Sequence, residues 1–215
     1  MKLLLPLIAF SLLTSFLHGD APPAPPAPYA QDFEKLPEGK PPEEILVLSG
    51  DFTIKKAEGN TFIELAGDPL DSQGFLIGSA GFTTGIVSAR IQASSSGKRF
   101  PEFGIGAGGP NGYKVWIMPA VNQVQIIRGE QTLATAPYAW TTGQWTRLKF
   151  QARKTENGKF RIEGKAWSDG KDEPGEWSIS ADILEAPPAG KATFWCTPYS
   201  GTPTRFDDLA VTPSP

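Results

Sequence analysis

The stretch that decides the fold is Gly143–Ile179, GQWTRLKFQARKTENGKFRIEGKAWSDGKDEPGEWSI. Apolar and polar side chains alternate along it twice, and a period of two residues predicts β-strands with one dry and one wet face. Between the two runs stands Glu156-Asn157-Gly158, and Asn-Gly readily adopts the positive φ angles of a hairpin turn. The stretch therefore predicts a long antiparallel hairpin, whose expected dry face comprises Leu148, Phe150, Ala152, Ile162, Gly164 and Ala166.

The rest of the chain repeats this pattern in shorter form. No segment keeps a sustained helical repeat, and short apolar or alternating runs are separated by Gly, Pro and Asn. We expect an all-β fold, a two-sheet antiparallel jelly-roll sandwich. The predicted strands are Gln31–Glu34, Glu44–Leu48, Asp51–Lys56, Thr61–Ala66, Gly74–Gly78, Thr84–Ala93, Glu102–Ala107, Tyr113–Met118, Gln123–Arg128, Thr132–Ala136, Gln144–Arg153, Lys159–Trp167, Trp177–Ala181, Ala192–Thr197 and Thr204–Val211.

The N-terminal residues predict export. Lys2 precedes the apolar run Leu3–Leu17, so residues 1–19 are expected to be a secretory signal peptide; an uncleaved anchor is the alternative. Residues 20–28 form a Pro/Ala-rich spacer, and residues 29–215 form one β-sandwich domain. The protein is thus expected to be secreted or periplasmic, with no membrane span after signal cleavage.

Composition excludes several kinds of chemistry. The net charge is −3 and basic residues are interleaved with acids, which argues against nucleic-acid binding. The one histidine, His18, lies in the signal, so the mature chain cannot build a Ser-His-Asp triad, a Cys-His pair or a histidine-ligated metal site. The one cysteine, Cys196, stands in an apolar run and is expected to be a small buried side chain.

Several short motifs resemble one superfamily. They are Asp32-Phe33-Glu34, Gly50–Ile54, Gly59-Asn60, Gly143–Phe150, Gly164–Trp167, Glu173–Trp177 and Phe206–Pro213. Together they resemble the concanavalin A-like lectin/glucanase jelly roll, in the laminin-G-like form of secreted bacterial proteins. This resemblance implies a fold and a habit of binding glycans or proteins, but the superfamily includes enzymes, lectins and adhesion modules.

Catalysis is not expected. The glucanases of this superfamily carry a Glu-x-Asp-x-x-Glu strand, and this motif is missing from the chain. The one i, i+2 carboxylate pair, Asp32 and Glu34, stands directly after the spacer, where a cleft floor is improbable.

These acids suggest a structural ion instead. First and last strands run side by side in such jelly rolls, which would bring Asp32 and Glu34 near Asp207 and Asp208. Converging carboxylates could hold Ca²⁺, which takes six to eight oxygen ligands. The alternative is that they are edge-strand charges that prevent aggregation.

Aromatic side chains are the main candidates for glycan stacking. The expected ligand-binding residues are Trp116, Trp140, Trp167 and Tyr199, with Glu102 and Arg128 as hydrogen-bonding partners. The glycine-rich run Phe103–Gly112 could leave a shallow groove beside them, or only make room for a facing Trp. Packing in the core or at its rim is the alternative for each aromatic residue.

The sequence thus predicts a secreted, non-catalytic carbohydrate-binding module. One alternative is a glycoside hydrolase of the same superfamily, which needs two carboxylates within about 10 Å in an open cleft. The other is an envelope or adhesion module that binds a protein through an exposed apolar patch.

Overall fold

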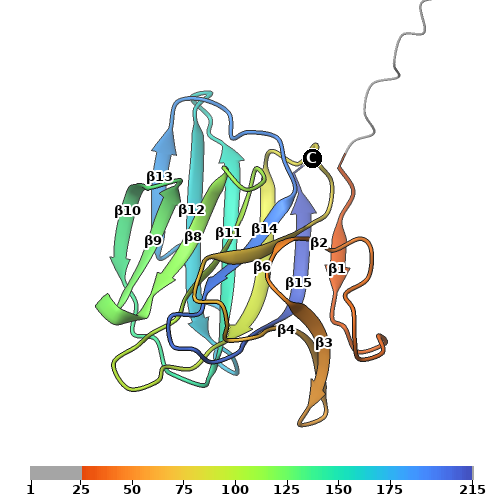
Figure 1. Ribbon diagram of the computed structural model, residues 1–215. Helices are drawn as coiled ribbons and strands as arrows, with labels where there is room; N and C mark the ends of the chain where they lie inside the picture. Colours follow the sequence, from red (N-terminus) through yellow and green to blue (C-terminus); the bar gives the residue numbers. More distant parts are fainter. Residues whose placement is uncertain (1–25, 215) are drawn as a thin grey trace, which may run out of the picture.

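A computed structural model describes residues 26–214. It shows two antiparallel β-sheets packed face to face, so the predicted all-β sandwich is confirmed (Figure 1). The expected signal peptide and most of the spacer lie outside the described residues. Within residues 26–214, no helix has the length and hydropathy needed to cross a bilayer.

The eight-stranded sheet contains both terminal strands. Its order is β13 (Ile179–Ile183), β12 (Phe160–Ser168), β11 (Trp145–Lys154), β6 (Gly85–Gln92), β15 (Thr204–Pro213), β4 (Asn60–Leu65) and β3 (Phe52–Ala57), with β1 (Tyr29–Gln31) paired to β15. β1 and β15 are antiparallel, with Tyr29 opposite Val211. The expected adjacency of the first and last strands is therefore confirmed.

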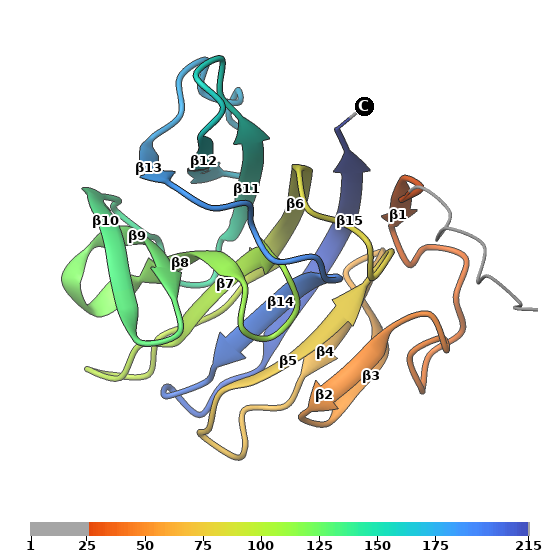
Figure 2. The same ribbon diagram turned by 90° about the horizontal axis from the view of Figure 1, so that it is seen from above.

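The seven-stranded sheet forms the other layer, seen from above in Figure 2. Its order is β10 (Gln131–Pro137), β9 (Gln123–Arg128), β8 (Tyr113–Met118), β7 (Glu102–Ala107), β14 (Ala192–Thr197), β5 (Gln73–Ile77) and β2 (Leu46–Ser49). A single 3₁₀ turn, η1 (Pro119–Val121), joins β8 to β9. At one edge of the sandwich β13 touches β9 and β10, which brings the two sheets together there.

The hairpin of β11 and β12 has the predicted register. Leu148 pairs with Ala166, Phe150 with Gly164 and Ala152 with Ile162, and these side chains face the interior. Gly164 has a packing reason, because a Cβ there would come within 2.5 Å of Cγ2 of Val115 on the facing sheet. The hairpin thus supplies the rigid frame of the eight-stranded sheet.

Two of the strand boundaries that were predicted wrongly have a clear cause in the structure. β1 ends at Gln31 because the chain turns there: Phe33 has a φ of 60° and the backbone N–H of Glu34 donates to the Asp32 carboxylate. β13 begins at Ile179 because Trp177 belongs to the preceding loop, where its ring lies over the Lys165 ammonium at 4.8 Å. Both errors arise from side-chain contacts that compete with strand pairing.

The core is continuous between the sheets and rich in phenylalanine. Phe75 stacks on Phe194 with ring centroids 5.1 Å apart, and it meets Phe52 and Phe206 edge-on at 5.1 and 5.4 Å. Cys196 is fully buried nearby, as expected, and burial raises the pKa of its thiol to about 12. This thiol has the properties of a packing group.

Candidate functional site

The outer face of the eight-stranded sheet carries a dense set of ion pairs. Its centre is Arg90, whose guanidinium lies 2.6 Å from the Asp207 carboxylate and 3.1 Å from Asp169. Arg147 bridges Asp169 and Asp208, the latter at 3.0 Å. These charges neutralise one another, so this part of the face is a structural network.

Trp145 belongs to the same face. The guanidinium of Arg90 lies 4.7 Å from the centre of its ring, and Phe62 packs against the ring edge. This indole therefore shields the buried network from one side.

The loop 169–178 is fastened onto this sheet. Lys149 and Lys165, which face each other on β11 and β12, both reach Glu173 at 2.7 Å. Lys165 also donates to the carbonyl oxygen of Pro174 and lies under the Trp177 ring. The Glu173 carboxylate thus offsets the repulsion between the two lysine ammonium groups, which explains why they can lie opposite each other on this face.

This attachment is expected to be sensitive to acid. Hydrogen bonds from Lys149 and Lys165 hold the pKa of Glu173 below its usual 4.5. Burial acts to raise the pKa of Asp169, but hydrogen bonds from Arg147 and Arg90 outweigh it and leave that pKa below 3.8. Both carboxylates therefore stabilise the fold above the unfolded-state pKa values, and the stabilisation is lost as the pH falls through the lower folded-state values.

Amide hydrogen exchange in the loop 169–178 measures this effect. We expect protection to fall at acid pH before the core strands lose theirs. Asp169→Asn combined with Glu173→Gln should give fast exchange in the loop already at neutral pH. A loop equally protected in this double variant would contradict the assignment.

The four acids expected to bind calcium have separate partners. The Glu34 carboxylate accepts from the backbone N–H of Thr61 at 3.0 Å, and Asp32 accepts from the N–H of Glu34. Asp207 and Asp208 bind Arg90 and Arg147, as described above. Among residues 26–214 no group of three or more His, Cys, Asp or Glu is placed to hold a metal ion, and calcium binding stays a prediction.

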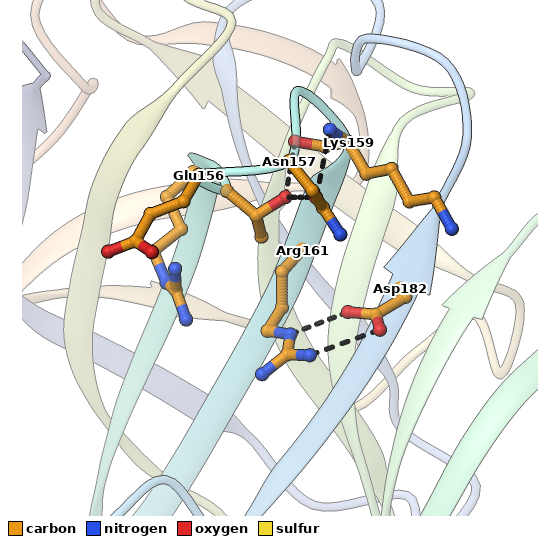
Figure 3. A pocket seen from close by; sticks show the side chains of 7 residues that line it. Glu156, Asn157, Lys159, Arg161 and Asp182 are labelled. Carbon is orange, nitrogen blue, oxygen red and sulfur yellow. Dashed lines mark hydrogen bonds and ion pairs between the residues drawn. The ribbon is translucent and has the colours of Figure 1, made fainter.

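A hollow of about 340 Å³ lies at the tip of the β11–β12 hairpin. Figure 3 shows that Arg161 from β12 reaches across to Asp182 of β13, and two hydrogen bonds of 2.5 and 3.0 Å join them. Arg153 is bound in the same way to Glu163. Both arginines at this tip are thus paired with acids, which favours a structural role for them.

The outer face of the seven-stranded sheet is different, because aromatic rings and glycines alternate across its strands. Strand pairing places Gly74, Trp195, Gly104, Trp116 and Gln125 in one row across β5, β14, β7, β8 and β9. We call this the Trp-Gly row. It combines two large flat rings with positions that lack side chains.

The glycines of the row are required by the rings. A Cβ on Gly74 would lie 2.6 Å from ring atom Cδ2 of Trp195, and one on Gly104 would lie 2.7 Å from Cε3 of Trp116. Each indole therefore lies against the sheet backbone next to a glycine instead of standing upright from the surface. The face is kept low and open along the row.

A hollow of about 230 Å³ lies over this row. Its walls come from five separate parts of the chain, so it runs across the strands of the sheet. The lining residues are Ser72, Pro110, Lys114, Trp116, Ile127, Gly129 and Trp195. Trp195 is partly exposed and Trp116 is only 7% exposed, so Trp195 is the more accessible of the two rings, with the Lys114 ammonium over it at 5.3 Å from the ring centre.

Two polar atoms near the row have no hydrogen-bond partner among residues 26–214. They are the indole nitrogen of Trp195 and the hydroxyl oxygen of Thr193, both buried and on successive outward positions of β14. Folded proteins leave few such atoms unpaired. Both atoms are enclosed by the protein, and Thr193 is not among the residues that line the hollow, so these two atoms do not define a contact for a ligand.

Only one carboxylate lies on the strands of this sheet. It belongs to Glu102 of β7, and it accepts a hydrogen bond of 3.2 Å from the indole nitrogen of Trp116. The next two outward positions on β7 are Gly104 and Gly106. Glycosidases use two carboxyl groups, about 5–10 Å apart, and these strands offer a single one.

The structure separates the ligand-binding residues expected from the sequence. Trp116 and Glu102 are brought together, as described. The Arg128 guanidinium covers the Tyr113 ring at the end of β9, and Trp140 packs edge-on against Phe103 of the core. Trp167 lies on β12 of the other sheet, and Tyr199 is exposed in the β14–β15 loop.

Trp195 and Lys114, which line the hollow, are not among the ligand-binding residues expected from the sequence. A signal for Trp195 was available, since it stands between Thr193 and Thr197 in an alternating run. Its importance depends on the glycines of β5 and β7 beside it, and the sequence does not show which strands pair.

Comparison with solved structures places the chain among β-sandwich domains. Similar structures include the carbohydrate-binding module CBM66 from Bacillus subtilis, with a TM-score of 0.53 and 12% identity over 79% of this chain and 96% of that chain. A Crh5 transglycosylase in complex with NAG gives a TM-score of 0.57 and 9% identity over 89% of this chain and 88% of that chain. A protein of unknown function from Shewanella oneidensis MR-1 gives 0.51 and 16% over 88% and 87%.

At these identities the likeness establishes the fold. It is consistent with the lectin/glucanase-like sandwich, while the laminin-G-like form stays a prediction. No protein-family model matches the chain, and no curated protein matches its sequence.

Proposed function

We propose that this protein is an exported carbohydrate-binding module whose binding site is the outer face of the seven-stranded sheet. The single observation that carries the proposal is the Trp-Gly row with its hollow. Sugar rings present flat C–H faces that pack on indole rings, and their hydroxyl groups need hydrogen-bond partners from the protein. Trp195 offers a partly exposed ring, and Ser72 and Lys114 offer polar groups in the lining of the hollow.

The lining of the hollow is drawn from several strands of the sheet. Its lining runs from Ser72 before β5 to Gly129 after β9, and neighbouring strands lie about 4.8 Å apart. Two of the similar structures bear names that refer to carbohydrate binding or transglycosylation, which agrees with this proposal.

Binding without hydrolysis fits the chemistry of this face best. Glu102 is the only carboxylate on the strands of this sheet. These strands therefore do not form the pair of carboxyl groups that glycosidases use, one as the acid and the other as the base or nucleophile. A protein-binding role is less favoured. The large apolar side chains that are exposed in residues 26–214 lie on β2 and in separate loops and turns. They are Leu46, Leu48, Leu70, Val121, Leu184 and Tyr199.

The proposal predicts that Trp195→Ala weakens polysaccharide binding by about 10- to 100-fold, the range expected when a central Trp anchor is removed. Affinity electrophoresis and pull-down with a panel of soluble and insoluble polysaccharides measure the loss. The matched control is Trp167→Ala, which removes a partly buried indole from the opposite sheet and should leave binding unchanged. Loss of binding in the control alone would move the site to the other face, and no retention of the folded protein on any polysaccharide would refute the function.

A further inference from the structure

Lys114 occupies an unusual position beside the Trp-Gly row. Its side chain starts from β8, one outward position from Trp116, and its ammonium lies 5.3 Å from the centre of the Trp195 ring. The ammonium donates one hydrogen bond, of 2.9 Å, to the carbonyl oxygen of Pro110. It therefore stands in the wall of the hollow, over the ring of Trp195.

No carboxylate neutralises this ammonium among residues 26–214. Lys149 and Lys165 on the other sheet share Glu173, whereas Lys114 forms no ion pair with any described acid. The seven residues that line the hollow include no Asp or Glu, so Lys114 is its only charged group. Burial lowers the pKa of Lys114, as expected for a cation that is partly removed from water without a counter-ion.

We propose that the hollow binds acidic polysaccharides, in which sugar rings carry carboxylate groups, and that Lys114 pairs with one of these carboxylates. The inference rests on the proposed function, and it specifies the chemical class of the glycan. A uronic acid ring carries an anion that complements Lys114, and its C–H groups complement the apolar part of the lining, Trp116, Ile127 and the partly exposed edge of Trp195. The apolar walls strengthen the ion pair because they reduce its contact with water.

The distribution of charge on the protein supports this preference for acidic sugars. The chain as a whole has a net charge of −3, so an acidic polymer is not attracted to its surface in general. Glu102 lies on the far side of Trp116 from Lys114 along the strand direction, and it is already bound to the Trp116 indole. A ligand carboxylate therefore has one favourable place in the hollow, next to Lys114.

The test compares polygalacturonate with the same polymer after methyl esterification, which removes the charge and keeps the sugar. We expect the full-length folded protein to prefer polygalacturonate, and we expect Lys114→Gln to weaken that binding by about 10-fold or more. Lys114→Arg keeps the charge and should retain the preference. Lys56→Gln, an exposed lysine on the other sheet, serves as the matched control and should have no effect.

The outcomes separate the two proposals. Equal binding of the charged and esterified polymers, unchanged in Lys114→Gln, would overturn the acidic preference and leave carbohydrate binding intact. Equal binding of dextran sulfate with the same dependence on Lys114 would overturn the assignment to carboxylates. If neither these polymers nor any neutral polysaccharide binds, both proposals fail. Circular dichroism of each variant serves as the control that it is folded.

Discussion

Arg90→Met is expected to lower the free energy of unfolding by about 3–5 kcal/mol, because it leaves the Asp207 carboxylate buried without its cation. Asp207 is 1% exposed, and Arg90 contacts it at 2.6 Å while also binding Asn60 and Asp169. Methionine fills much of the volume of the arginine stem, so the loss of unfolding free energy reflects the lost charge more than a new cavity. Urea denaturation followed by tryptophan fluorescence measures it.

The matched control is Arg161→Met at the hairpin tip. Arg161 binds Asp182, but both side chains are well exposed, and surface pairs of this kind contribute about 1 kcal/mol or less. Arg90→Met with Asp207→Asn should recover part of the loss, since it removes the buried charge. Equal losses of unfolding free energy in Arg90→Met and Arg161→Met would contradict the assignment of Arg90 and Asp207 as a buried ion pair.

The pH dependence of Arg90→Met has a defined sign. Burial raises the pKa of Asp207, and hydrogen bonds from Asn60 and Arg90 oppose this only in part. Without Arg90 the folded-state pKa should rise further, so the destabilisation is largest at neutral pH and diminishes in acid, where Asp207 is protonated. A pH series of the same denaturation experiment tests this sign.

Phe75→Ala is expected to destabilise the fold by a similar amount, about 3–5 kcal/mol. The Phe75 ring is fully buried and touches three other phenylalanine rings, from β3, β14 and β15, so its removal opens a cavity between the two sheets. Thermal and chemical denaturation measure this loss of stability. Phe160→Ala at the start of β12, where the ring is only partly buried, should cost less than half as much; equal losses would contradict the central role of Phe75.

Local patterns predicted the strands of this protein well. The alternation along β11 and β12 and the Asn-Gly turn between them fixed the hairpin register, because both signals depend on neighbouring residues only. The adjacency of the terminal strands was also correct. The acids near that edge were expected to converge, but Asp207 and Asp208 bind Arg90 and Arg147, which come from strands far away in sequence.

The candidate site was predictable only in part. Trp116, Glu102 and the glycine-rich run were recognised, and they do lie on one face. Trp195 and Lys114 were not, because the Trp-Gly row forms only when β5, β14, β7 and β8 are placed side by side. Pairing of strands so distant in sequence has no local signal, and it alone decides which glycine lies beneath which ring.

The pairing of β1 with β15 has a practical consequence for engineering. Tyr29 lies opposite Val211, so the first and last strands bring the start and the end of the domain side by side in the eight-stranded sheet. A short peptide could join these two points, and new termini could be opened in the exposed turn 155–159. Such a circular permutant should fold, and its new ends would leave the seven-stranded sheet uncovered for immobilisation on a sensor surface.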